Sequence, residues 1–223
     1  MEYAGNRGNG ATAWTVGILC LIQLVSGACR QNTNSNDGSG RQATADTKIV
    51  TLGSFAVEVP TGWTSFSSGE AASLRRQFLE QSSQIYQQYS GSSEDPAKSV
   101  DVAAFHIEGD EAVFAIVSFT VPSHADLIPL LKSEAGDKAD WGVRNGFIRK
   151  YLGLIPIDDE TWSGFYIKMI GKNGNVEVSA GLEHKKLKNT IIQITLISPK
   201  AWDEAKATDS LGDILKSLVL KQK

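Results

Sequence analysis

The chain has 223 residues, a formal net charge of −3 and a hydrophobic content of 41%. These totals are typical of a globular protein that is long enough to bury a sizeable core. The mild acidic balance, without any run of basic residues, argues against nucleic-acid binding and against a polybasic membrane-binding segment.

The first 28 residues have the layout of a secretory signal. Arg7 supplies the basic n-region, and an apolar h-region follows from about Trp14 to Val25. A membrane-spanning helix would need about 20 predominantly apolar residues, whereas this segment is shorter and contains Gln23. We therefore expect residues 1–28 to be a removed signal peptide.

The end of that segment, Leu24-Val25-Ser26-Gly27-Ala28-Cys29, resembles the lipobox of bacterial lipoproteins. The resemblance implies that the thiol of Cys29 is lipidated after the preceding residues are removed. Ser26-Gly27-Ala28 also fits ordinary signal peptidase, so plain secretion stays as the alternative. Cys20 is the only other cysteine and lies in the removed segment, so plain secretion would leave one unpaired thiol in an oxidising compartment. This cysteine count favours the lipid anchor.

Residues 29–46 comprise Cys29 and a polar tether. The stretch 30–46 (RQNTNSNDGSGRQATAD) contains no large apolar side chain and cannot offset the entropy of ordering. A flexible segment of this length has a root-mean-square reach of about 20–25 Å. We expect it to hold a folded domain, residues 47–223, clear of a bilayer.

The first part of that domain predicts two strands, a helix and a hairpin. Strands are expected over 48–52 and 55–59, with Phe55, Val57 and Val59 on one face. A capping-box pattern from Ser67 to Glu70 predicts a helix over 70–90. Two β-rich runs, 100–107 and 112–121, flank a turn at 108–111, and because they are apolar on both faces they predict strands covered on both sides.

The second part predicts a helix, three further strands and a final helix. Ser123 to Asp126 opens a helix, and residues 136–157 are compatible with either a short helix or a strand. Asn173-Gly174 predicts a hairpin between strands over 162–170 and 176–182. A strand over 190–197 precedes a helix that buries Leu211, Ile214, Leu215 and Leu218. This order predicts an α+β fold, a single layered domain with a mostly antiparallel sheet.

Two short motifs carry a resemblance to a known superfamily. The opening is Phe55-Ala56-Val57-Glu58-Val59-Pro60-Thr61-Gly62-Trp63, and the closing pattern runs from Ile192-Gln193-Ile194-Thr195-Leu196 through Ser198-Pro199 and Trp202 to Ile214-Leu215-Lys216-Ser217-Leu218. The pair resembles the superfamily of the photosystem protein PsbP and the bacterial lipoprotein DcrB. The resemblance implies an αβα sandwich that serves as an accessory or binding module and has no shared catalytic residues.

The sequence around the three histidines predicts neither a catalytic triad nor a metal site. No Gly-x-Ser-x-Gly elbow accompanies them. His106 and Glu108 would share one face of a strand, but two ligands are too few for a zinc site. We interpret this pair as ordinary surface structure, and His124 and His184 as solvated polar residues.

Two acidic segments and one aromatic segment complete the candidates. The acids at 158–160 and at 108, 110 and 111 lack the spacing of a calcium loop and are interpreted as hydrophilic turns. Trp141, with Phe147, Ile148 and Tyr151, is the best candidate for an exposed apolar groove, with core packing as the simpler interpretation.

The sequence therefore predicts a lipid-anchored protein of the cell envelope, on the extracytoplasmic side of a membrane and periplasmic in a Gram-negative cell. We expect a non-catalytic accessory or binding module whose partners are the membrane, through Cys29, and a protein of the envelope. A secreted or anchored hydrolase with an unrecognised site is the alternative. No catalytic residue, cofactor site or metal ligand is assigned, and no nucleic-acid partner is expected.

Overall fold

The computed structural model describes residues 46–90, 99–107, 112–121, 127–187 and 189–221. Cys29, the predicted signal peptide and nearly all of the predicted tether lie outside these residues, so the predictions made for them stay predictions. His124, Glu108 and the turn at 108–111 also lie outside the described residues. No helix in the described part of the chain is both long and apolar enough to span a membrane.

Ten strands and three helices make up the described part of the domain. In chain order they are β1 (Thr47–Leu52), β2 (Phe55–Pro60), β3 (Thr64–Ser65), α2 (Ser68–Ser90), β4 (Ser99–His106), β5 (Val113–Thr120), α3 (Leu127–Arg144), β6 (Ile148–Asp158), β7 (Trp162–Gly171), β8 (Val176–His184), β9 (Thr190–Ile197), α4 (Glu204–Ser217) and β10 (Val219–Leu220). The predicted strands and helices are confirmed within a few residues, whereas the two-residue strands β3 and β10 were not predicted.

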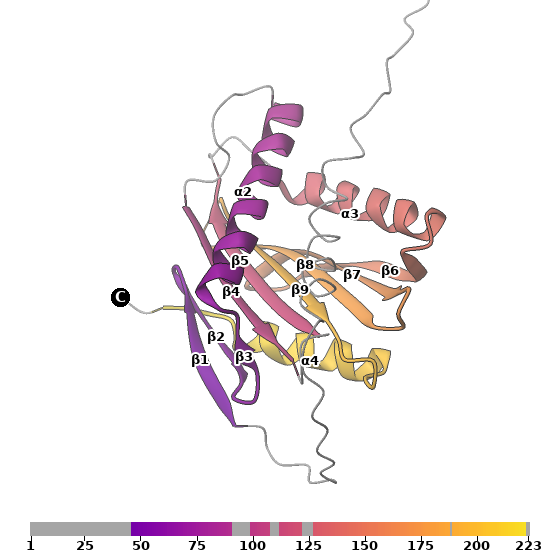
Figure 1. The fold of residues 1–223 in the computed structure, drawn as a ribbon. Helices are drawn as coiled ribbons and strands as arrows, with labels where there is room; N and C mark the ends of the chain where they lie inside the picture. Colours follow the sequence, from indigo (N-terminus) through magenta and orange to yellow (C-terminus); the bar gives the residue numbers. More distant parts are fainter. Residues whose placement is uncertain (1–45, 91–98, 108–111, 122–126, 188, 222–223) are drawn as a thin grey trace, which may run out of the picture.

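The elements form three layers (Figure 1). The middle layer is a seven-stranded sheet in the order β3-β4-β5-β9-β8-β7-β6, and all its pairings are antiparallel. Helices α2 and α3 cover one face. Helix α4 and a small sheet, β1-β2-β10, cover the other. The α+β class and the αβα-sandwich architecture predicted from the sequence are confirmed by this layering.

Strand β5 shows why the sheet is apolar on both faces. Its Val117 and Phe119 pack in a cluster with residues of α2 and α3. Phe114 and Ile116 point the other way and pack with residues of β2 and α4. Because neighbouring side chains of a strand alternate between faces, a strand between two covering layers carries apolar residues at nearly every position.

Helix α2 begins at the predicted capping box. The backbone N–H of Ser67 donates to Oε2 of Glu70 over 2.8 Å, and the N–H of Glu70 donates to Oγ of Ser67 over 3.3 Å. These reciprocal bonds satisfy two N–H groups that a helix start otherwise leaves unpaired. Farther along α2, Leu74 is buried, and the ring of Phe78 lies 4.8 Å from that of Phe119 on β5.

The ambiguous segment 136–157 contains the end of α3 and nearly all of β6. The N–H of Phe147 donates to the carbonyl of Gly142, and the N–H of Gly146 donates to the carbonyl of Val143. These two bonds, with Gly146 at φ +74°, form the Schellman motif that ends many helices. The helix and the strand thus meet within four residues, too closely for hydrophobic periodicity to separate them.

Candidate functional site

A groove opens where α4 ends and β10 begins. Its volume is about 720 Å³, within the range of small-molecule and cofactor sites. The chain builds it from the β6–β7 turn, the end of β8 and the segment 215–220. Its apolar lining comprises Ile157, Trp162, Leu182, Leu215, Leu218, Val219 and Leu220. We call this feature the α4–β10 groove.

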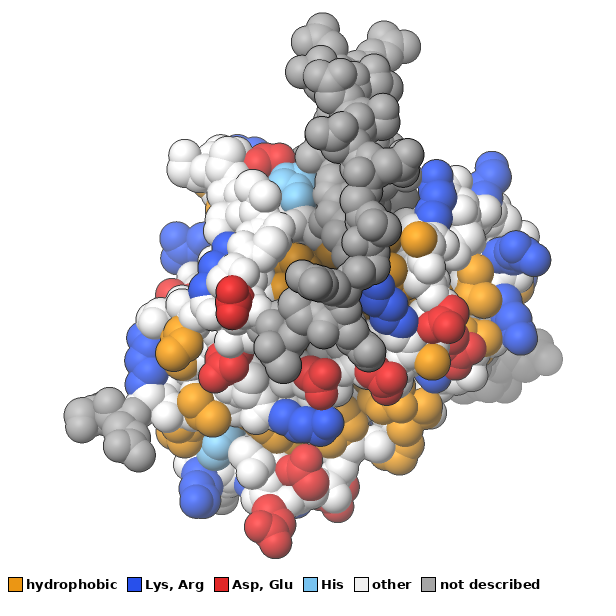
Figure 2. Space-filling model, turned by 90° about the horizontal axis from the view of Figure 1, so that it is seen from below, with side chains coloured by type: hydrophobic (Ala, Val, Ile, Leu, Met, Phe, Trp, Pro, Cys, Tyr) orange, Lys and Arg blue, Asp and Glu red, His pale blue; other side chains and the backbone are white. Residues whose placement is uncertain are grey.

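Charged and polar groups surround the apolar lining. Asp159, Glu160 and Thr161 come from the β6–β7 turn, and Lys186 and Lys216 contribute ammonium groups. Both signs of charge are therefore present at the rim. In the view of Figure 2, acidic and basic side chains are likewise interspersed with hydrophobic ones.

His184 is the only imidazole in the groove lining. Its Nδ1 accepts the backbone N–H of Lys186 over 3.0 Å, so the neutral ring carries its proton on Nε2 and can donate from there. Burial, and next the charge of Lys186, lower the pKa of His184 below its usual 6.5, which keeps the ring neutral at pH 7.

The interpretation of His184 as a solvated residue was wrong. The side chain is buried, and its ring lies edge-on to Trp162 with 4.8 Å between ring centroids. The ring of Phe55, from β2, lies 6.0 Å away. The sequence showed only charged neighbours, whereas the small sheet and the β6–β7 turn bring two aromatic rings against it.

The acidic segment 158–160 is a turn, as interpreted. Oδ1 of Asp159 accepts the N–H groups of Thr161 and Trp162, each over 2.7 Å. These backbone hydrogen bonds lower the pKa of Asp159. Asp158 pairs with Nζ of Lys185 at 2.7 Å. Both carboxylates thus hold the turn that places Trp162 in the groove.

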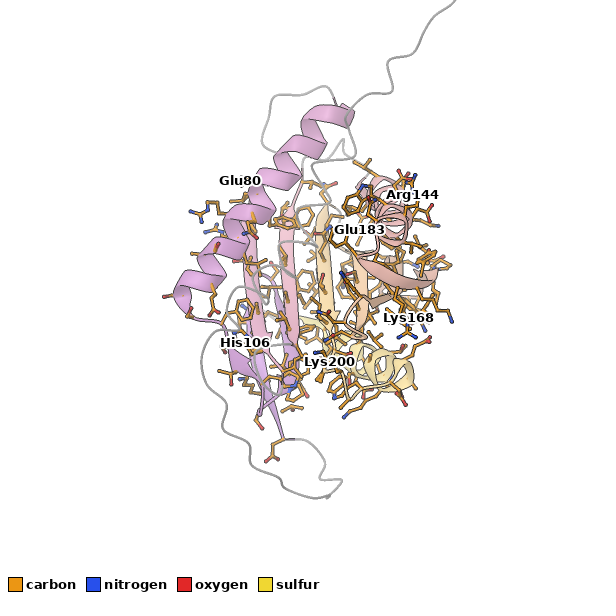
Figure 3. All side chains as sticks on the ribbon, turned by 45° about the vertical axis from the view of Figure 1, so that its right-hand side comes forward. Glu80, His106, Arg144, Lys168, Glu183 and Lys200 are labelled. Atoms are coloured by element: carbon orange, nitrogen blue, oxygen red, sulfur yellow. The ribbon has the colours of Figure 1, made fainter. Side chains whose placement is uncertain are left out.

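His106 occupies a different place, beside the start of α2 (Figure 3). Its Nε2 lies 3.4 Å from Oε1 of Glu70, and its ring stacks on Phe66 at 4.5 Å. Hydrogen bonds from Ser67, and next the neighbouring His106, lower the pKa of Glu70. The residue that the fold brings to His106 is therefore Glu70, 36 positions earlier in the chain. Among the described residues, no three His, Cys, Asp or Glu side chains lie close enough to hold a metal ion.

The aromatic candidates divide into two pairs. Ile148 and Tyr151 pack beside a buried cluster under α3. Trp141 and Phe147 instead stack on each other at the end of α3, with ring centroids 5.3 Å apart and an angle of 8° between the rings. Phe147 is 45% exposed. The segment therefore forms an aromatic pair of one half-buried and one exposed ring rather than the groove that was considered.

Comparisons with known proteins find solved structures that are similar to this chain at low sequence identity. No protein-family model and no curated protein matches the chain significantly. The solution structure of cyanobacterial PsbP (CyanoP) from Synechocystis is similar to this chain at 14% identity and a TM-score of 0.49, covering 83% of this chain and 98% of that one. The Ran-binding protein Mog1p of Saccharomyces cerevisiae is similar at 14% identity and a TM-score of 0.38, covering 79% and 96%. A PsbP is thus among the proteins this chain is similar to, but likeness of this degree assigns neither a family nor a partner.

No sequence pattern predicted the α4–β10 groove. Its lining comes from three separate segments, and β10 has only two residues. The final helix was predicted, but its meeting with the β6–β7 turn and the end of β8 depends on how the layers pack.

Proposed function

We propose that this protein is a lipid-anchored, non-catalytic binding module of the cell envelope, held by Cys29 and binding a protein partner in the α4–β10 groove. The observation that carries the binding role is the groove itself, an open hollow with an apolar floor and charges of both signs at its rim. The anchor is supported by the lipobox-like sequence that ends at Cys29.

The backbone of β10 supports a peptide as the bound group. Val219 is paired with Ala56 of β2, and the N–H of Lys221 donates to the carbonyl of Ser54. In an antiparallel pair, hydrogen-bonded positions alternate, so the N–H and C=O of Leu220 point away from β2. Among the described strands, β10 pairs only with β2. An extended segment of a partner can add to this edge and place its apolar side chains in the groove.

The state of His184 favours binding over hydrolysis. In a nucleophilic triad, the histidine donates its Nδ1–H to an acidic side chain and uses Nε2 as the base. Here Nδ1 accepts a backbone N–H, so the neutral ring presents a proton at Nε2 instead of a lone pair. This arrangement suits a hydrogen bond to a carbonyl oxygen of a bound peptide.

Site-specific photo-crosslinking in intact cells tests the groove. A photoreactive amino acid replaces Lys186 at the groove rim or, as a matched control, Lys132, an exposed lysine on α3. We expect one discrete adduct from position 186, none of the same mass from position 132, and loss of the adduct when Leu220→Arg places a charge in the groove. The same adduct from both positions would contradict the proposal.

Metabolic labelling with a fatty acid tests the anchor separately. We expect the wild-type chain to incorporate the label and Cys29→Ala to lose it, whereas Cys20→Ala leaves labelling unchanged because this residue lies in the removed segment. Labelling that persists in Cys29→Ala would refute the anchor without bearing on the groove.

A further inference from the structure

A second surface feature lies at the end of α3 and the start of β6. Three apolar side chains, Trp141, Val143 and Phe147, lie there, and Val143 and Phe147 are 42% and 45% exposed. Val143 and Phe147 are two of the four large hydrophobic side chains that are exposed among the described residues.

Four cations accompany them. Arg144, Arg149 and Lys150 lie within ten residues of Trp141, and all three are exposed. The sheet adds Lys172, also exposed, whose backbone N–H donates to the carbonyl of Phe147 over 3.0 Å. We call these three apolar residues and four cations the α3–β6 patch. The four cations do not form a basic run in the sequence, because they are spread along the chain and Lys172 belongs to the β7–β8 turn.

The charge of the patch is not neutralised locally. Residues 139–151 and 171–175 carry the four cations and a single carboxylate, Asp140, a local charge of +3 in a chain whose net charge is −3. None of the four cations forms an ion pair with another described residue. Nε of Arg144 donates to the backbone carbonyl of Asp140, which leaves its charge available.

The helix end fixes the aromatic pair at the surface. In a Schellman motif, the residue two beyond the helix cap commonly contacts an apolar residue in the last turn. Phe147 and Trp141 are that pair, and the hydrogen bonds of Phe147 to Gly142 and of Gly146 to Val143 hold the loop in place. Little conformational freedom is therefore lost when the pair contacts another surface.

We infer that the α3–β6 patch is a docking surface for an anionic lipid bilayer, which would set the orientation of the anchored domain. Aromatic rings beside arginine and lysine are the combination that favours the membrane–water interface. The inference rests on the proposed anchor for its biological setting. The anchor alone leaves the orientation open, because 17 tether residues span at most about 60 Å and the seven-stranded sheet is about 29 Å wide.

The position of the patch suits this role. The described chain begins at β1, on the opposite side of the domain from β6 and the end of α3 (Figure 1). Arg144 and His106 lie on opposite sides of the domain, with His106 on β4 beside the start of α2 (Figure 3). Contact through the patch would thus bring the side of the domain that carries α3 and β6 to the bilayer. The tether by itself would attach only the side that carries β1.

The test uses the chain expected after signal removal, residues 29–223, with a histidine tag in place of the signal peptide. A chelating lipid holds this tag on vesicles, so the test does not depend on lipidation of Cys29. An environment-sensitive fluorescent amino acid replaces Val143 in the patch or, as a control, Ile49, which is 73% exposed on β1. The vesicles contain phosphatidylcholine alone or with added phosphatidylglycerol. We expect a blue shift at position 143 only on the anionic vesicles, no shift at position 49, and reversal by high salt.

Charge variants identify the cause. Each basic residue strengthens contact with an anionic surface about fivefold, so Arg149→Gln with Lys150→Gln should lower the ratio of docked to undocked chain about 25-fold. Arg75→Gln with Arg76→Gln is the matched control, because these are also two adjacent, exposed cations but lie on α2. We expect this control to dock like the wild type, and thermal unfolding of both variants verifies that they fold.

Three outcomes would overturn the inference. Equal emission at position 143 on both kinds of vesicle would show that anionic lipid is not recognised. Equal loss of docking in the two double variants would show a response to net charge alone. A shift on adding a single-stranded oligonucleotide without vesicles would assign the patch to nucleic acid, for which stacked aromatic rings and cations are also suited. None of these outcomes bears on lipidation or on the α4–β10 groove.

Discussion

The two faces of the seven-stranded sheet are buried in different ways. One contiguous cluster of 23 buried residues joins the sheet to α4, β1 and β2. On the opposite face, the described residues form three separate clusters of seven, five and three buried residues beneath α2 and α3. The composition of the covering elements explains the contrast, because α4 buries Ala207, Leu211 and Ile214 on one side, whereas α2 has a sequence rich in serine and glutamine.

This difference separates the two surfaces to which we assign roles. The α4–β10 groove lies at the edge of the continuous cluster, which holds its lining in place without a ligand. The α3–β6 patch lies beside the smallest cluster and is positioned by a helix-end motif instead. Interactions that stabilise the α4 face should therefore support the whole fold, whereas those on the other face should act more locally.

The largest expected effect comes from removing one phenylalanine ring on each face. Phe114 packs against Trp63 in the continuous cluster, and Phe119 packs against Phe78 of α2. We expect Phe114→Ala to lower the free energy of unfolding by about 4–5 kcal/mol and Phe119→Ala by about 3 kcal/mol, because α2 can shift to fill part of the second cavity. Urea denaturation measures both values, and an equal or reversed order would remove the distinction between the faces.

A smaller effect is expected from the helix caps. Oδ1 of Asp203 accepts the N–H of Lys206 at the start of α4, and Ser67 caps α2. We expect Asp203→Ala to lower the global free energy of unfolding by about 1 kcal/mol. Ser67→Ala should mainly speed amide hydrogen exchange within α2 and leave β5 protected. Faster exchange in β5 after Ser67→Ala would show that α2 supports the whole domain.

The smallest effects are expected from pH, and they begin at different pH values in the two regions. Burial lowers the pKa of His184 from 6.5 in the folded chain. Below pH 6.5 the unfolded chain therefore binds a proton at this side chain more readily than the folded chain does, and the free energy of unfolding falls as the pH drops. The pKa of Glu70 is lowered from 4.5 by the bonds from Ser67, so its contribution is present above pH 4.5 and is lost as the pH falls through the folded value.

Denaturation over a range of pH separates the two groups. His184→Asn can still accept the N–H of Lys186 but does not titrate, so the loss that begins below pH 6.5 should shrink. Glu70→Gln preserves the capping box without a charge and should shrink only the loss that begins below pH 4.5. Unchanged profiles in both variants would mean that other groups control the acid response.

Local patterns predicted much of the fold. The capping box at Ser67 and Glu70, the alternation in β2 and the Asn173-Gly174 turn each depend on residues that are neighbours in the chain, and each is confirmed. The segment 136–157 resisted prediction because a Schellman motif joins α3 to β6 within four residues. The burial of His184 resisted prediction because Phe55 and Trp162 arrive from distant strands.

The sequence by itself determined most of the elements, their order and the α+β class, because helix caps, turn residues and hydrophobic periodicity act over a few residues. It did not determine β3, β6 or β10. It also carries the lipobox-like segment at Cys29, which stays a prediction. Only the tertiary structure decided that His184 is a buried, neutral donor, that β10 has an edge beside a groove, and that Lys172 joins three cations beside Trp141 and Phe147. Those features depend on contacts between segments far apart in the chain, where packing of the layers, rather than local propensity, determines which side chains meet.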